Sequence, residues 1–242
     1  VRSIKNGVDY VYFYGAGASS ESLKDIIKDG LQRIMPEAKI NVDHDLVASA
    51  YSTYTGVPAI TCILGTGSNS CYFDGESVSE EVPALAYVLG DEGSASFIGK
   101  RLVSDFLYKR LPDEMAEDFY HTYQLDKDEI ITSVYNKPNA NVYLASFSRF
   151  AGKHMENPYV KMIVREGFAK FADIHIACFE NCREVPIHFV GSVGAIFQEL
   201  LEDVLAERGM NLGQIMRKPV DGLIKYHVEY LKVLEVYQAQ SW

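Results

Sequence analysis

The sequence predicts an α/β fold. Three observations favour this class: short runs of β-branched and aromatic residues, the glycine turns that end these runs, and the segments of helical hydrophobic spacing that follow them. Strands that alternate with helices build layered α/β domains. The 242 residues are enough for one large domain or two small ones with a sizeable core.

The beginning of the chain has a β-α-β-α pattern. Residues 9–14 (DYVYFY) predict a short strand that stops at a glycine turn, and Ser19 or Ser20 can cap the helix after it. Residues 39–42 predict a second strand. The DHD sequence at residues 43–45 then opens an alanine-rich helix.

A pair of strands is predicted next. Residues 59–64 (AITCIL) have the composition of a buried strand, which the glycines of residues 65–67 interrupt. Extended structure resumes at residues 70–73. Asp74-Gly75 is a two-residue hairpin signal, so residues 76–78 are expected to form the return strand. The glycine turn at 65–67 therefore joins a strand to a strand.

The remainder of the chain is mostly helical in pattern. Helical segments are expected at residues 94–107, 141–150, 158–182 and 195–208, shorter helices at residues 113–134, and a last helix that begins at Pro219. Residues 187–190 (IHFV) interrupt them as a strand, which a second glycine turn ends.

Composition excludes several classes of protein. Hydrophobic residues make up 48% and charged residues 23%, as in ordinary globular proteins, and the net charge of -10 disfavours nucleic-acid binding. No apolar run is long enough to span a membrane. The four cysteines lack zinc spacing and are expected to be free thiols in a reducing cytoplasm, with Cys178 and Cys182 on one face of a helix.

The LGTGSNS motif at residues 64–70 can bind phosphate. Its glycines let backbone N–H groups approach an anion closely, and its threonine and serines add hydroxyl donors. A plain hairpin or bulge is the alternative. The VGSVG motif at residues 190–194 can present amides to an anion or support a planar ring, or it is an ordinary turn between strand and helix.

Two acidic motifs can supply carboxylates. In the DHD sequence one aspartate can cap the following helix, and the other can act as a general base at the carboxyl end of a strand. The GDEGS motif at residues 90–94 is either a capping turn or a site where a carboxylate accepts hydrogen bonds from substrate hydroxyls. No Walker loop is present, and the dinucleotide-binding fingerprint fails because a strand follows the glycines and position 70 is serine.

The fixed order of these four motifs resembles the BadF/BadG/BcrA/BcrD ATPase family and, within it, the N-acetylglucosamine kinase-like branch. YFYGAG near the start and PVDGLIKYH near the end extend the similarity over nearly the whole chain. The resemblance implies a two-lobed actin-like ATPase (ribonuclease H-like) fold. One lobe would comprise residues 1–57 with a returning helix at 219–242, and the other residues 58–218.

The resemblance also implies individual roles. Asp45 matches the catalytic aspartate that takes the proton from a sugar 6-hydroxyl, and Asn69, Asp91 and Glu92 match sugar ligands. The ATP-binding residues would be Gly65, Thr66, Gly67, Ser68, Gly191, Ser192 and Val193. ATP and Mg²⁺ are the implied cofactors, and no residue of this chain is assigned to the metal.

The implied function is ATP-dependent phosphorylation of an amino sugar, N-acetylglucosamine in the first place, by a cytoplasmic homodimer. Two alternatives remain: an ATPase that activates a dehydratase through an iron–sulfur cluster between subunits, and a non-catalytic sugar sensor. The family begins with a strand-turn-strand rich in Gly, Ser and Thr, and nothing like it precedes Val1. The chain is therefore expected to be a fragment lacking this hairpin, or the ordered part of a longer protein. A smaller departure is Ala95, where many relatives have glycine.

Overall fold

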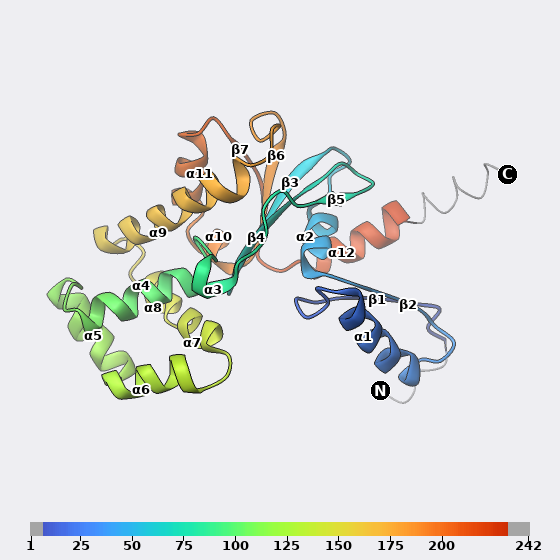
Figure 1. The fold of residues 1–242 in the computed structure, drawn as a ribbon. Coiled ribbons are helices and arrows are strands. Elements are labelled where there is room, and N and C mark those ends of the chain that lie inside the picture. The colour runs from blue at the N-terminus through green and yellow to red at the C-terminus, as the bar shows by residue number, and fades with distance from the viewer. Residues whose placement is uncertain (1–6, 232–242) are drawn as a thin grey trace. The chain divides into compact units, whose positions relative to one another are not determined.

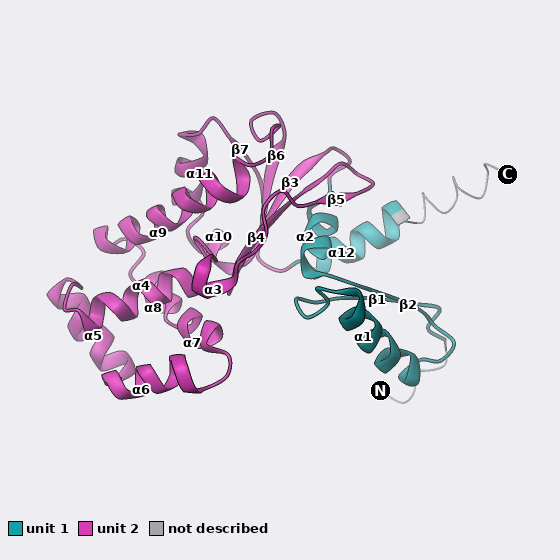
Figure 2. Ribbon diagram, viewed as in Figure 1, with its two compact units in different colours: residues 1–54, 219–242 teal, residues 55–218 magenta. Residues whose placement is uncertain are grey.

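The computed structural model describes residues 7–231 and divides the chain into two compact units (Figure 1). The first unit takes residues 1–54 together with 219–242, and the second takes residues 55–218, shown in teal and magenta in Figure 2. The chain thus leaves the first unit after its second helix and returns to it near its end.

The first unit contains a two-stranded parallel sheet with helices. Strands β1 and β2 pair from Tyr10↔Lys39 to Tyr14↔Asp43, so the predicted strand-helix-strand crossover is present. Its elements are β1 (Tyr10–Tyr14), α1 (Glu21–Ile34), β2 (Lys39–Asp43), α2 (Asp45–Thr53), α12 (Val220–Tyr226) and the π-helical turn η3 (His227–Leu231).

Local side chains determine where the two early helices begin. Ser20 caps α1, because its Oγ accepts a hydrogen bond from the N–H of Leu23 at 3.4 Å. The cap of α2 is His44, whose Nδ1 accepts from the N–H of Leu46 at 3.3 Å. Neither aspartate of the DHD sequence is the cap, so the capping role considered for them is wrong.

Aromatic contacts hold the returning helix α12 within the first unit. The ring of Tyr226 stacks on that of Tyr51 in α2, with centroids 4.2 Å apart and planes 8° apart. The hydroxyl of Tyr14 in β1 lies 3.0 Å from Nε2 of His227. Stacked aromatic pairs stabilise by about 0.5–1.5 kcal/mol beyond their area burial.

The second unit contains a mixed five-stranded sheet in the order β5-β4-β3-β6-β7. Strand β4 is antiparallel to both β3 and β5, whereas β6 is parallel to both β3 and β7. The central strand β3 therefore has its hairpin partner on one side and a strand from the far end of the chain on the other. The strands are β3 (Ala59–Leu64), β4 (Ser68–Phe73), β5 (Val78–Ser79), β6 (Pro186–Val190) and β7 (Asn211–Met216).

Helices pack against this sheet and bury its core. Ile60, Cys62 and Leu64 of β3 are fully buried together with Ile98 of α4 and Phe168 of α9. None of the helices described is long and apolar enough to cross a lipid bilayer. The helical elements are α3 (Ala86–Leu89), α4 (Ala95–Leu107), α5 (Asp113–Tyr123), α6 (Lys127–Ile131), η1 (Thr132–Asn136), α7 (Ala140–Ser146), α8 (Ser148–Lys153), α9 (Pro158–Phe171), η2 (Ala172–Ile176), α10 (Ser192–Ile196) and α11 (Gln198–Ala206).

Three predictions of local structure differ from the result. The helical region ends at Ile176 and turns follow it, so Cys178 and Cys182 do not share a helix face. The return strand is Val78–Ser79 instead of residues 76–78. The carboxylate of Asp74 accepts hydrogen bonds from the N–H groups of Glu76 and Ser77, so these two residues belong to the turn. Strand β7 was missed, since its sequence NLGQIM contains a glycine and few β-branched residues.

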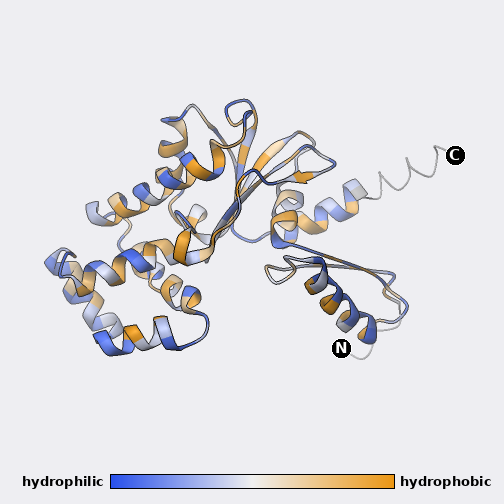
Figure 3. Cartoon of the chain, viewed as in Figure 1, coloured by the Kyte–Doolittle hydropathy of each residue, from blue (hydrophilic) through white to orange (hydrophobic). Residues whose placement is uncertain are grey.

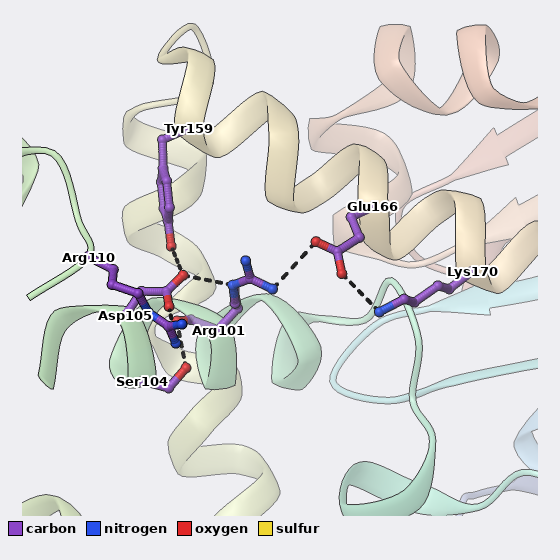
Figure 4. Close-up of polar contacts among 7 residues, drawn as sticks. All are labelled: Arg101, Ser104, Asp105, Arg110, Tyr159, Glu166 and Lys170. Carbon is purple, nitrogen blue, oxygen red and sulfur yellow. Dashed lines mark hydrogen bonds and ion pairs between the residues drawn. The ribbon is translucent and has the colours of Figure 1, made fainter. Parts of the chain in front are cut away.

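A buried carboxylate joins α4 to α9. Asp105 is 2% exposed, and its oxygens lie 2.7 Å from Nε of Arg101, 2.8 Å from Nη2 of Arg110 and 2.7 Å from the hydroxyl of Tyr159 (Figure 4). Arg101 also reaches Glu166 of α9 at 3.4 Å. Since a buried charge is costly unless it is paired, these contacts compensate for the burial of the Asp105 carboxylate, and loss of one partner would leave a buried charge unpaired.

Candidate functional site

The glycine turn at residues 65–67 is tight and docked onto α4. The N–H of Gly65 donates to the carbonyl of Gly67 at 3.0 Å, and the carbonyls of Gly65 and Thr66 accept from the N–H groups at the start of α4 at 2.9 and 3.1 Å. Within the described part of the chain, the N–H groups of Thr66 and Gly67 have no acceptor. Backbone N–H groups without an acceptor can donate hydrogen bonds to a bound anion such as phosphate.

Asp91 of the GDEGS motif lies directly against this turn. Its Oδ1 accepts from the N–H of Ser68 at 3.1 Å, and Ser96 donates to its Oδ2 at 3.4 Å. A Cβ at Gly67 would lie 2.8 Å from Asp91 Oδ1, so glycine is required by this close approach. Two motifs that were predicted separately therefore form one structure.

The environment of Asp91 is unusual in two ways. Its backbone has φ of 59°, in the left-handed region that residues other than glycine rarely use, and it is 8% exposed. Burial raises the pKa of the Asp91 carboxyl, and the hydrogen bonds from Ser68 and Ser96 only partly oppose this. Strained backbone that the surroundings hold in place is frequent at functional sites.

Asn69 lies on β4 beside a carboxylate that the sequence did not single out. Its Nδ2 donates to Oε2 of Glu80 at 3.3 Å, and its Oδ1 accepts from the N–H of Ser70 at 2.8 Å. Glu80 directly follows β5. Only strand pairing brings Glu80 to Asn69, and the acidic pair at positions 80 and 81 carries no motif that would have identified it.

Glu92 faces a buried histidine. Its Oε2 lies 3.4 Å from Nε2 of His175, whose ring stacks on Phe171 with centroids 5.0 Å apart. The hydroxyl of Ser70 donates to the carbonyl of His175 at 2.6 Å. His175 belongs to η2, where the sequence predicted only a helix, so no signal pointed to it.

The VGSVG motif connects β6 to α10. Gly191 has φ of 132°, and a Cβ there would lie 2.2 Å from the carbonyl oxygen of Leu64. The N–H of Gly191 donates to the carbonyl of Met216 at 2.9 Å. Glycine is therefore required where this turn passes the end of β3.

A cavity of about 370 Å³ in the second unit brings two of the predicted motifs together. Thr66 of the first glycine turn and Ser192 and Val193 of the second line it. Arg149 of α8 and Arg217, which follows β7, line it as well, and neither was predicted. Two guanidinium groups beside backbone turns and hydroxyls suit a polyanionic ligand.

Asp45 belongs to the first unit, where it is the first residue of α2. The two aspartates of the DHD sequence are not equivalent: Lys24 Nζ lies 3.0 Å from Asp43, whereas no lysine or arginine between residues 7 and 231 pairs with Asp45. Asp45 Oδ1 lies 3.0 Å from Nδ1 of His44, and its side chain is 39% exposed. Of the two carboxylates, Asp45 is therefore the one that no lysine or arginine among the described residues neutralises, and it can accept a proton from a ligand.

The part of the chain that the structure describes holds no group of three or more His, Cys, Asp or Glu side chains placed to bind a metal ion. Burial raises the pKa of the Cys62 thiol well above its ordinary value and that of Cys71 to about 12. These two thiols are therefore poor metal ligands and poor nucleophiles.

The chain has the fold of the actin-like ATPases, as the family resemblance of its sequence implied. The crystal structure of a candidate N-acetylglucosamine kinase from Porphyromonas gingivalis superposes with a TM-score of 0.88 and 36% identity, covering 95% of this chain and 79% of that one. A candidate N-acetylglucosamine kinase from Chromobacterium violaceum shares the fold, with a TM-score of 0.62, 16% identity, and coverage of 77% and 65%. This chain belongs to the same family of sugar kinases as the P. gingivalis protein. No protein-family model and no curated protein matches it.

Proposed function

We propose that this chain transfers the γ-phosphate of ATP to the 6-hydroxyl of an amino sugar, N-acetylglucosamine, as a member of the N-acetylglucosamine kinase-like branch of the BadF/BadG/BcrA/BcrD family. The observation that carries the proposal is the 36% identity to the P. gingivalis candidate N-acetylglucosamine kinase over 95% of the chain. The cytoplasmic location predicted from the free cysteines is part of the proposal. A homodimer is also part of the proposal.

ATP would bind in the second unit. The turn from Gly65 to Ser68 would hold the phosphates through its free N–H groups and hydroxyls, and Gly191, Ser192 and Val193 would hold the adenosine. The cavity that Thr66, Ser192 and Val193 line supports this assignment. We add Arg149 and Arg217 to the ATP ligands, because a chain with a net charge of -10 attracts a polyphosphate only through such local positive groups.

The sugar would bind through Asn69, Asp91 and Glu92, to which Glu80 is added. Carboxylate oxygens accept hydrogen bonds from sugar hydroxyls, and each oxygen of Asp91 has one protein donor and a second lone pair left for a ligand. A site that holds buried acceptors rejects sugars lacking the matching hydroxyl, because those acceptors would then be unpaired.

Asp45 would be the general base. It takes the proton of the sugar 6-hydroxyl as that oxygen bonds to the γ-phosphorus, the bond to the bridging oxygen of ADP breaks, and ADP leaves with the electron pair. A positioned base contributes about 10²–10⁴-fold to the rate. The pairing of Asp43 with Lys24 supports the choice of Asp45 over its neighbour.

Mg²⁺ is usually held by one or two carboxylates together with substrate phosphates, and when bound it neutralises charge on the transferred group. The residues described provide no protein cage for a metal. We therefore propose that Mg²⁺ enters with ATP, and no step above is assigned to it.

The test is ADP release from Mg-ATP with a panel of hexoses and hexosamines, on protein of known intact mass. Release with N-acetylglucosamine, and not with glucose, is the expected result. Release without any sugar would point instead to an ATPase of the dehydratase-activating kind. Sugar binding in calorimetry with no release of ADP, even in longer versions of the protein, would point to a sugar sensor.

A further inference from the structure

His175 is a buried histidine at the point where α9 ends. It belongs to the π-helical turn η2, in which the N–H of Ala177 donates to the carbonyl of Ala172 at 2.9 Å. Hydrophobic residues, orange in Figure 3, alternate with hydrophilic ones along α9, and Phe171 at its end is fully buried. Turns of this kind are frequent at functional sites. Since buried polar side chains are nearly always hydrogen-bonded, the ring of His175 is expected to have a partner.

Two contacts fix the position of His175. Its ring stacks on that of Phe171, with centroids 5.0 Å and planes 22° apart. Its carbonyl accepts a hydrogen bond from the hydroxyl of Ser70 at 2.6 Å. The last carbonyls of a helix have no partner within the helix, so Ser70 supplies one that the turn needs. Ser70 belongs to the LGTGSNS motif, which is thereby joined to η2.

The ring of His175 faces Glu92 of the GDEGS motif. Nε2 of the ring lies 3.4 Å from Oε2 of Glu92, which is longer than an ideal N–H···O hydrogen bond. Contacts in ligand-free sites are often long and shorten when the substrate is bound. The side chain of Glu92 is 17% exposed and that of His175 is 4% exposed. Glu92 can therefore touch a ligand, whereas His175 acts only through Glu92.

The surroundings of the His175 ring decide which nitrogen carries the hydrogen. Nδ1 is buried and has no hydrogen-bond partner among the described residues. A hydrogen on Nδ1 would be a buried donor without an acceptor, and Nε2 would then be an acceptor that faces a carboxylate. A neutral ring with the hydrogen on Nε2 avoids both costs. His175 is therefore a donor to Glu92.

Glu92 needs such a donor because a second carboxylate lies close to it. Burial, the larger cause, and the charge of Glu92 both raise the pKa of the Asp91 carboxyl. Like charges at this separation repel each other. No lysine or arginine between residues 7 and 231 pairs with Glu92. His175 thus opposes a repulsion that would otherwise turn the Glu92 carboxylate away from Asp91.

The contacts close a circuit through both motifs. Ser68 of β4 donates to Asp91, the neighbour of Glu92. Ser70 of β4 donates to His175, whose ring faces Glu92. We propose that His175 is a positioning residue of the sugar site, and that its Nε2–H holds one oxygen of Glu92 so that the other accepts a hydrogen bond from the sugar. The inference rests on the proposed function, because it takes Glu92 as a sugar ligand.

The experiment measures sugar binding by calorimetry in a double-mutant cycle. His175→Phe keeps a ring for the stack on Phe171 and removes the donor, so affinity for N-acetylglucosamine should fall about tenfold. Affinity for a non-hydrolysable ATP analogue should stay the same. His175→Gln keeps a donor and should lose less sugar affinity than His175→Phe does. In protein that already carries Glu92→Gln, His175→Phe should cause no further loss, because the partner is gone.

His154→Phe is the matched control. Nε2 of His154 lies 2.7 Å from Oδ2 of Asp118, and its ring centroid is 4.4 Å from that of Phe150. The substitution therefore also removes a contact between a histidine and a carboxylate beside a phenylalanine ring of the second unit, away from the four motifs. Its sugar affinity should equal that of the unchanged protein.

Two outcomes would overturn the inference and leave the proposed function in place. One is full sugar affinity in His175→Phe, and the other is an equal loss with and without Glu92→Gln. Failure of the unchanged protein to bind any hexose or hexosamine would overturn the proposed sugar site and this inference together.

A measurement on the unchanged protein covers the case in which His175→Phe does not fold. NMR of the imidazole nitrogens, with the His175 signal identified by its absence in His175→Gln, should show the hydrogen on Nε2 at pH 7. A hydrogen on Nδ1 would mean that His175 does not donate to Glu92, and the inference would be wrong.

Discussion

The carboxylate of Asp91 accepts a hydrogen bond from the backbone N–H of Ser68 at 3.1 Å. Ser68 opens β4 directly after the glycine turn, and Asp91 stands 23 residues later in the GDEGS motif. The contact holds the turn in the shape that leaves its N–H groups free. It also uses only part of the accepting capacity of a buried carboxylate.

Asp91→Asn is expected to weaken binding of the sugar about 10- to 100-fold, because hydrogen bonds to a charged group contribute about 1.5–3 kcal/mol. Calorimetry with N-acetylglucosamine measures the change. Asp74→Asn is the control, since Asp74 accepts backbone hydrogen bonds in an exposed hairpin turn of the same unit. Unchanged affinity in Asp91→Asn would remove this residue from the sugar site.

Asp91→Asn should not lower the free energy of unfolding. Burial raises the pKa of Asp91, so the folded protein holds the proton to a higher pH than the unfolded chain does. The stability from this group is present at low pH and falls as pH rises through the folded pKa, which makes the ionised carboxylate a cost at neutral pH. Asp91→Asn removes that cost and keeps an acceptor for Ser68, so its unfolding midpoint at pH 7 should equal or exceed that of the unchanged protein.

Asp45→Asn is expected to reduce turnover by about 10²–10⁴-fold with little change in sugar affinity, because only the general base is lost. Asp43→Asn is the matched control. Asp43 pairs with Lys24 at 3.0 Å, so Asp43→Asn should reduce turnover far less than Asp45→Asn does. Steady-state ADP release for both variants, on protein that phosphorylates sugar, makes the comparison. Equal losses in the two variants would contradict the assignment of the base.

Gly191→Ala should destabilise the second unit by about 3 kcal/mol or more and abolish ATP binding. Its φ of 132° is strained for alanine, and the new Cβ would lie 2.2 Å from the carbonyl oxygen of Leu64. Gly194→Ala is the control in the same motif, since its nearest neighbours would be at 3.6 Å, an ordinary contact. Urea unfolding measures both, and a stable Gly191→Ala protein would show that the turn can relax.

Arg217→Met is expected to raise the KM for ATP about 10- to 100-fold, with sugar affinity unchanged. The reason is the loss of a charge-assisted hydrogen bond to the nucleotide, in a cavity that Thr66 and Ser192 also line. Arg165→Met serves as the control, because Arg165 pairs with the exposed Glu207 on the surface of the same unit. If both arginine variants have the same KM, Arg217 does not contact ATP.

Asp105→Asn is expected to lower the free energy of unfolding at pH 7 by on the order of 2–3 kcal/mol, because Arg101, Arg110 and Tyr159 lose their shared anion. Urea unfolding measures this loss. Asp203→Asn, at an exposed site on α11, is the control and should change stability little.

The stability lost in Asp105→Asn should also depend on pH. Burial by itself raises the pKa of Asp105, but the hydrogen bonds from Tyr159 and Arg101 outweigh it and hold the pKa below its ordinary value. A carboxyl of this kind adds stability above its unfolded pKa of about 3.9, and the contribution disappears as pH falls through the folded pKa. The difference between Asp105→Asn and the unchanged protein should therefore narrow below about pH 4. A difference that stays constant from pH 7 to pH 3 would contradict this account.

Local signals in the sequence predicted most of the elements. Ser20 caps α1 as expected, and the strand at residues 59–64 and the helix at residues 198–206 lie within or close to their predicted ranges. These signals work because capping and glycine turns depend on neighbouring residues. The prediction that the helix continues to Cys182 was wrong. The apolar residues keep a helical spacing beyond Ile176, where the structure has turns, and only tertiary packing distinguishes these turns from a helix.

By itself the sequence determined the class of fold and the order of the four motifs, because hydrophobic periodicity and glycine turns are properties of short segments. Only the tertiary structure decided which of those segments meet. It paired β6 with β3 and added the unpredicted β7, which brings Arg217 into the cavity with Thr66, and it placed Asp91 against Ser68 and Glu80 against Asn69. These contacts depend on strand order and on burial across distant parts of the chain, for which a single sequence carries no local signal.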